Sequence, residues 1–83
     1  MELTRIIHSR ILESPVPAKI LAKKIGKTYS TLLREVNPDD EGAKLGVETF
    51  VQILKITGDF APLEYIASEL GLEITPKKMR KAG

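Results

Sequence analysis

Residues 18–37 read AKILAKKIGKTYSTLLREVN, and their spacing predicts a defined geometry in addition to burial. Leu21, Ala22 and Ile25 recur at i, i+1 and i+4, which places them on one face of a short helix. Ala22 is small, so a second helix can cross close over it. Gly26 stands where helices commonly end in a left-handed residue, because glycine has no Cβ to clash at positive φ. The first helix of this stretch is therefore predicted to stop at Gly26.

A second helix is predicted directly after the turn, over residues 29–36. Thr28 can serve as its N-cap, and Leu32 and Val36 lie one turn apart on its inward side. Together with the preceding helix, residues 17–25, it forms a helix-turn-helix. This geometry leaves the N-terminal turn of the second helix facing outward.

Three further helices are predicted, over residues 2–13, 47–57 and 62–70, so the fold class is an all-α bundle of five helices. Each has apolar residues at helical spacing that form an inward face. These faces are Leu3, Ile6, Ile7 and Ile11 in the first, Val47, Phe50, Val51 and Leu54 in the second, and Leu63, Ile66, Ala67 and Leu70 in the third. The helix of residues 47–57, with Gly46 as its N-cap, is apolar around more than half of its circumference. It therefore needs a second neighbour, which the helix of residues 62–70 is expected to supply.

Length and composition restrict the chain to one small intracellular domain. Its 83 residues allow a single core, which we place at residues 1–74, and no cleft between two lobes. There is no cysteine, which excludes a disulfide framework and a thiolate zinc site. No apolar run approaches the roughly 20 residues of a membrane span, and the N-terminus does not have the pattern of a signal peptide. We therefore expect a cytoplasmic protein without a membrane partner.

The net charge of +2 conceals a segregation of charge along the chain. Residues 1–36 carry seven basic residues (Lys or Arg) and three acidic ones (Asp or Glu). Residues 37–74 carry two basic and eight acidic residues, and residues 75–83 carry four basic residues and no acidic one. The half that contains the helix-turn-helix is thus basic, and the following half is acidic. A polyanion would be attracted to one face and repelled by the opposite one. The basic tail, residues 75–83, is predicted to be disordered.

The helix-turn-helix predicts a DNA-binding surface, in which the N-terminal half of the second helix enters the major groove. The residues expected to contact bases are Tyr29, Ser30, Thr31 and Arg34. Those expected to contact phosphates are Lys19, Lys23, Lys24, Lys27 and Thr28, close to the positive end of the helix dipole. Lysines on the outside of a helix often have no role beyond contact with solvent. Here their position beside the helix-turn-helix favours phosphate binding.

The acidic loop after the second helix of this motif resembles a calcium-binding loop only in part. Asn37, Asp39, Glu41, Gly42 and Glu48 fall at positions 1, 3, 5, 6 and 12 of a calcium-binding loop, but a proline occupies position 2 and a lysine position 8. The acidic loop is instead expected to point away from a bound polyanion.

The single histidine, His8, lacks a second ligand or an acid in a motif-like arrangement. No nucleophile, histidine and acid follow one another in a known order, and no glycine loop could cradle a phosphate. The sequence therefore predicts no enzymatic activity, no metal or other cofactor and no small-molecule ligand.

Three runs of the sequence resemble the phage CII-type regulatory protein family. They are IGKTYSTLLREVNP at residues 25–38, GAKLGVETFVQI at 42–53 and TGDFAPLEYIASELGL at 57–72. Members share an IGKS-type turn, an STL…R…NP recognition segment, a GAKLG entry to the fourth helix and a TGD…PLE…A…LGL ending. The resemblance covers residues 18–72, and its segments agree in order and spacing. It implies a lambda repressor-like DNA-binding domain and a phage or prophage regulator of the lysogenic decision.

The sequence is compatible with two classes of function. One is a sequence-specific transcription regulator whose partner is double-stranded DNA, and the other is a protein–protein interaction module on the same helical fold. The segregated charge favours the regulator, because a module that binds protein does not need lysines on the motif face and acids away from it.

A homodimer or higher homo-oligomer is expected, because a domain of this size reads only a few base pairs. The candidates for its seam are apolar residues left over after the core faces are assigned: Ile53, Ile56, Tyr65, Leu72 and Ile74. The alternative is that some of them complete the monomer core, since a small bundle uses nearly every large aliphatic residue it has. For Ile53 the two alternatives are equally supported.

Overall fold

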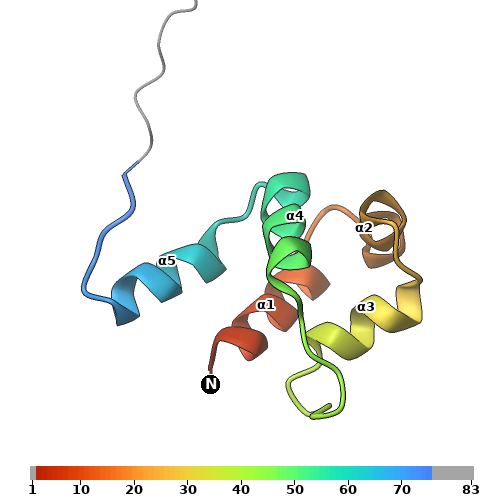
Figure 1. Ribbon diagram of the computed structural model, residues 1–83. Coiled ribbons are helices and arrows are strands. Elements are labelled where there is room, and N and C mark those ends of the chain that lie inside the picture. The colour runs from red at the N-terminus through yellow and green to blue at the C-terminus, as the bar shows by residue number, and fades with distance from the viewer. Residues whose placement is uncertain (1, 76–83) are drawn as a thin grey trace, which may run out of the picture.

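The protein is described by a computed structural model of residues 2–75, which over this range contains five helices and no strand. The helices are α1 (Glu2–Glu13), α2 (Ala18–Ile25), α3 (Tyr29–Val36), α4 (Val47–Thr57) and α5 (Ala61–Glu69). In Figure 1, α2 and α3 lie on one side of α1 and α4, and α5 lies on the other. The predicted all-α fold of five helices is confirmed, with the helix ends within one residue of their predictions. Apart from Thr75, the tail predicted to be disordered lies outside the described residues.

The turn between α2 and α3 has the predicted local chemistry. Gly26 has φ 90°, a left-handed conformation, and its N–H donates to the carbonyl oxygen of Ala22 at 2.9 Å. Thr28 is the N-cap of α3, where its Oγ1 accepts a hydrogen bond from the N–H of Thr31 at 3.1 Å. Because only Gly26, Lys27 and Thr28 separate the two helices, α3 begins at a fixed place relative to α2.

The hydrophobic core lies where α1, α2, α3 and α4 meet. It consists of Ile7, Ile11, Leu21, Ala22, Leu32, Val36 and Ile53, with Leu21, Leu32 and Val36 fully buried. Four of these residues come from the two helices of the quoted stretch, so this stretch is held by burial as well as by its caps.

The inward face predicted for α4 is wrong in part. Val47 and Val51 are 78% and 41% exposed, whereas Ile53 is 4% exposed and joins the core. The reason is that α4 packs against α2, and this contact selects a different part of a helix that is apolar over most of its surface. Ile56 also packs against the core. Ile53 is therefore a core residue of the monomer and not a seam residue.

The prediction for α5 also needs correction. This helix packs mainly against α1 and does not cover α4 as predicted. Ile66 and Ala67 are half-buried, but Leu63 and Leu70 are 36% and 67% exposed. Leu70 is already the C-cap of the helix, and α5 has a neighbour on one side only, so part of its apolar surface meets solvent.

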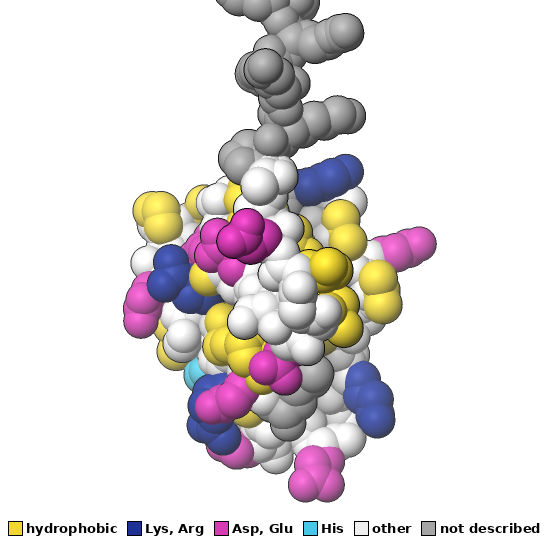
Figure 2. Space-filling view, turned by 90° about the vertical axis from the view of Figure 1, so that its left-hand side faces the viewer, with side chains coloured by type: hydrophobic (Ala, Val, Ile, Leu, Met, Phe, Trp, Pro, Cys, Tyr) yellow, Lys and Arg dark blue, Asp and Glu magenta, His cyan; other side chains and the backbone are white. Residues whose placement is uncertain are grey.

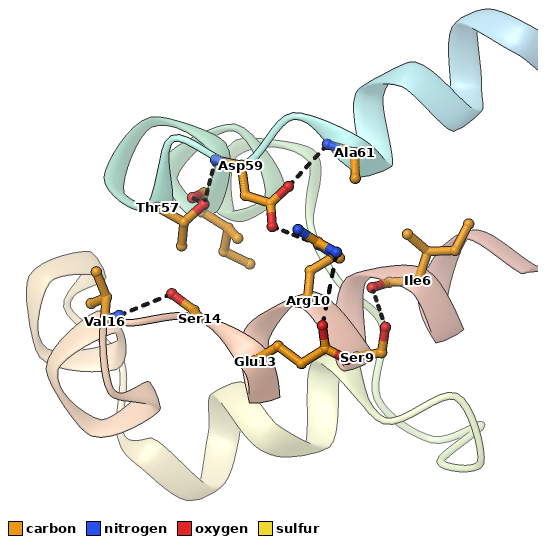
Figure 3. A network of polar contacts seen from close by, with 10 residues as sticks. Ile6, Ser9, Arg10, Glu13, Ser14, Val16, Thr57, Asp59 and Ala61 are labelled. Carbon is orange, nitrogen blue, oxygen red and sulfur yellow. Dashed lines mark hydrogen bonds and ion pairs between the residues drawn. The ribbon is translucent and has the colours of Figure 1, made fainter.

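A polar link fixes α1 to the connection between α4 and α5 (Figure 3). The Arg10 Nε donates to Oδ2 of Asp59 at 2.6 Å, and Oδ1 of Asp59 accepts from the N–H of Ala61 at 3.1 Å. The N–H of Asp59 in turn donates to Oγ1 of Thr57 at 3.2 Å. The hydrogen bond from Arg10 lowers the pKa of Asp59 below its ordinary value. The start of α5 is thus positioned by an ionised carboxylate.

Candidate nucleic-acid interface

The first turn of α3 exposes a row of polar side chains whose backbone is already ordered. Tyr29, Ser30 and Thr31 are all exposed, as predicted for residues that contact bases. Thr28 and Thr31 hold the turn together, since the Thr28 Oγ1 also donates to Oγ1 of Thr31 at 2.8 Å. The helix N-terminus adds unpaired backbone N–H groups, which favour a nearby anion. This part of α3 can therefore present donors and acceptors to a nucleic acid without first folding.

Lys19 and Tyr29 come together across the two helices. The Lys19 Nζ lies 5.5 Å from the centroid of the Tyr29 ring, which is a cation–π contact. Tyr29 is 41% exposed, so the pair lies at the surface. A residue predicted to contact phosphates and one predicted to contact bases are thus neighbours in space, although ten positions separate them in the sequence.

The other predicted phosphate contacts differ in their surroundings. Lys23 and Lys24 are exposed in the last turn of α2. Lys27 is half-buried, and its Nζ lies 3.2 Å from Oε2 of Glu35, with side-chain exposures of 27% and 16%. The charge of Lys27 is therefore already partly balanced. Its pairing was missed at the sequence level because eight residues separate Lys27 from Glu35, a spacing that matches no helical neighbour.

Glu35 is the one acidic residue of α3, and its side chain is only 16% exposed and is paired with Lys27. Its Oε1 is buried and accepts no hydrogen bond within the described part of the chain. The negative charge of α3 is therefore largely buried and partly balanced by Lys27.

Arg34, the fourth residue predicted to contact bases, is exposed but already has a partner. Its Nε lies 3.1 Å from Oδ2 of Asp40, and the two side chains are 64% and 24% exposed. The hydrogen bond from Arg34, with a second one from the N–H of Gly42, holds the pKa of Asp40 below its ordinary value. We expected the acidic loop to point away from this surface, and for Asp40 that expectation is wrong.

The reason for this difference lies in the loop itself. Asn37 follows α3 directly, its Oδ1 accepts from the N–H of Asp39 at 2.9 Å, and its carbonyl oxygen accepts from the N–H of Asp40 at 3.1 Å. This tight turn leads the chain back to the last turn of α3, where Arg34 stands. The Asn-Pro-Asp-Asp sequence signals the turn, but the direction in which it points depends on tertiary structure.

The remaining seam candidates lie on the other side of the molecule. Leu72 and Ile74 are 63% and 42% exposed, and Tyr65 is half-buried. Desolvation, followed by the charges of Glu69 and Glu2, raises the pKa of the Tyr65 hydroxyl above its ordinary value. Figure 2 shows the face that carries α5, where hydrophobic side chains lie among both acidic and basic ones.

The described range shows neither a metal-binding cluster nor a helix that could cross a membrane. Residues 2–75 contain no cluster of three or more histidine, cysteine, aspartate or glutamate side chains that could hold a metal ion. Asn37 and Asp40 of the acidic loop are engaged with the turn and with Arg34. None of the helices in this range has the length and hydropathy that crossing a bilayer requires.

Comparison with known protein families matches residues 2–82 to phage regulatory protein CII (CP76). The match covers nearly the whole chain and includes all five helices and the connections between them. Comparisons with curated proteins and with solved structures gave no significant match. On the strength of this match over residues 2–82, the chain belongs to the phage regulatory protein CII family.

Proposed function

We propose that this phage regulatory protein is a sequence-specific transcription regulator that binds double-stranded DNA and controls lysogeny in a phage or prophage. Family membership establishes a regulatory role, and the DNA-binding step is our inference. In this proposal α2 and α3 act as a helix-turn-helix, α3 lies in the major groove, and the protein acts at the nucleoid in the cytoplasm.

The observation that carries the proposal is the exposed row on α3. Tyr29, Ser30, Thr31 and Arg34 are all exposed, although the same short helix buries Leu32 and Val36 completely. A helix that is anchored on one side and polar on the other suits the major groove, whose width admits an α-helix. In this reading the four exposed residues contact bases.

Phosphate contacts are assigned to the basic residues around this row. Lys19, Lys23 and Lys24 are exposed on α2, and Thr28 caps the positive end of the α3 dipole. Lys27 takes a smaller share, because part of its charge is balanced by Glu35. Such contacts supply sequence-independent affinity, and base contacts supply the preference.

Fluorescence anisotropy tests this function directly. Duplexes from the DNA upstream of its own gene and of the neighbouring gene are compared with shuffled duplexes of the same composition, at several salt concentrations. We expect tighter binding to one upstream duplex, and for every duplex a linear fall of log K with log salt concentration. Equal affinity for natural and shuffled DNA would contradict sequence-specific binding.

We propose in addition that two copies associate through the face that carries α5. Five large hydrophobic residues in α5 or directly beside it in the sequence are exposed: Phe60, Leu63, Leu70, Leu72 and Ile74. A two-fold dimer doubles the DNA contacts and fixes the spacing of two half-sites. The same exposed residues favour the second candidate function, a protein-interaction module, if DNA binding is absent.

A further inference from the structure

The ion pair between Arg34 and Asp40 joins the proposed recognition helix to the acidic loop that follows it. Arg34 Nε and Asp40 Oδ2 are 3.1 Å apart, and Arg34 remains 64% exposed. The contact uses only one of the three guanidinium nitrogens. Among residues 2–75 neither Nη atom has a hydrogen-bond partner, and the side chain as a whole is 64% exposed.

Asp40 is itself fixed in place and does not merely follow Arg34. Its Oδ1 accepts a hydrogen bond from the N–H of Gly42 at 3.0 Å, and its own N–H donates to the carbonyl oxygen of Asn37 at 3.1 Å. One carboxylate oxygen therefore belongs to the turn and the other to Arg34. A flexible arginine is held by a carboxylate whose position the backbone determines.

This geometry has two consequences at a DNA surface. An arginine held before binding loses less side-chain freedom when it forms two hydrogen bonds to O6 and N7 of guanine. A carboxylate beside it also repels phosphates, so Arg34 is less useful as a general backbone contact. Both effects favour recognition of a base over recognition of the backbone.

We propose that Asp40 is a specificity-determining residue, which holds Arg34 in position to read a guanine and keeps it from serving as a phosphate contact. The proposal rests on the proposed function, because it concerns the preference of a protein that binds DNA. Asp40 is a positioning residue here and does not itself touch a base.

The test compares Asp40→Asn with the matched control Asp39→Asn. Both remove one negative charge from the same loop, and Asn at position 40 keeps an acceptor for the N–H of Gly42, but only Asp40 pairs with Arg34. Affinities are measured for the preferred duplex and for its shuffled version. We expect Asp40→Asn to lower the ratio of the affinity for the preferred duplex to that for the shuffled one roughly three- to tenfold, because Arg34 is no longer held in position before binding. Asp39→Asn should leave the ratio unchanged.

Two further variants separate positioning from other effects. In an Arg34→Ala background, Asp40→Asn should no longer change the ratio. Arg34→Lys should lose sequence preference to a similar degree. Lysine keeps the positive charge, but its single ammonium nitrogen cannot replace the separate guanidinium nitrogens that bond the Asp40 carboxylate and the guanine. This variant also gives a result if Asp40→Asn does not fold, which circular dichroism would show.

Several results would overturn the proposal. An unchanged affinity ratio for Asp40→Asn would show that the carboxylate does not contribute to the preference, and a higher ratio would show that it withholds Arg34 from the base. A change of ratio that persists without Arg34 would assign the effect to the loop, and an Arg34→Lys protein with full preference would exclude positioning. A wild type without any sequence preference would remove the proposed function and this inference together, whereas a selective wild type unaffected by Asp40→Asn would remove this inference alone.

Discussion

Arg34 and Lys27 are both assigned to the proposed DNA-binding surface, but their surroundings differ. Arg34 is 64% exposed and paired with a carboxylate of the loop, whereas Lys27 is 27% exposed and paired with a carboxylate of α3. Neither partner could be identified from sequence, because Asp40 and Glu35 lie at separations that are set by tertiary structure. What the sequence supplied was the exposed positions of α3, which follow from its helical period around the buried Leu32 and Val36.

The first prediction concerns Arg34→Ala. If the guanidinium reads a guanine, this variant should lose about 1 to 3 kcal/mol of binding free energy at the preferred site and relax the preference at one base pair. Lys23→Ala is the control, since Lys23 is exposed on α2 and is assigned to a phosphate. That control should weaken specific and shuffled DNA alike and reduce the salt slope by about one unit. Anisotropy on single-base variants of the site measures this change. If Arg34→Ala loses the same affinity for every variant, Arg34 contacts the DNA phosphate backbone and not a base.

At the scale of elements, helix ends were predictable because they depend on local chemistry. Gly26 and Thr28 occupy the capping positions predicted for them, and Gly58 ends α4 in a left-handed conformation with φ 68°. The face that a helix buries was predictable only where its apolar residues are few. α4 is apolar over most of its surface, so its contact with α2, which no local pattern reveals, determines that Ile53 is buried and Val47 exposed.

Gly26 provides the second prediction. No atom lies within 4 Å of the Cβ that Gly26→Ala would add, so the cost comes from φ 90° and not from a clash. We expect Gly26→Ala to lower the free energy of unfolding by about 1 to 2 kcal/mol, and Gly26→Asn to lower it by less, since asparagine adopts left-handed conformations more readily. Urea denaturation followed by circular dichroism measures both. Equal stability of the alanine variant and the wild type would show that the turn can relax away from positive φ.

At the scale of the whole molecule, α5 is joined to α1 by packing and by the pair of Arg10 with Asp59. The pKa of Asp59 is lowered in the folded chain by the hydrogen bond from Arg10, so the folded protein binds this proton less readily than the unfolded chain. The stability that the pair contributes is therefore present above the unfolded pKa of about 3.9 and is lost as pH falls through the lower folded value.

Asp59→Asn should accordingly be less stable than the wild type at pH 7, and the difference should narrow below about pH 4. Glu13→Gln is the control: it removes a carboxylate 3.8 Å from the same arginine, but this exposed pair should contribute little. Thermal unfolding at a series of pH values measures both variants. A stability difference for Asp59→Asn that does not change with pH would assign the effect to something other than the ionised carboxylate.

The next prediction concerns self-association through the face that carries α5. Leu72 and Ile74 are exposed in the monomer, so the double variant Leu72→Asp, Ile74→Asp should dissociate the dimer without disturbing the core. Leu12→Asp is the control, because Leu12 is similarly exposed but belongs to α1. Since residues 37–74 carry eight acidic and two basic residues, salt should strengthen the association by screening repulsion between copies. Sedimentation equilibrium that finds the wild type monomeric at tens of micromolar would exclude this dimer.

We propose that the exposed surface of α2 and α3, and not the face that carries α5, binds DNA. The most direct test is a nuclear magnetic resonance titration of the ¹⁵N-labelled protein with the duplex that it prefers, recorded at two salt concentrations. We predict that the largest amide shifts fall in residues 26–34, that those of residues 61–74 stay small, and that all shifts diminish at the higher salt concentration. Shifts concentrated in residues 61–74, or no shifts even at low salt, would contradict the claim.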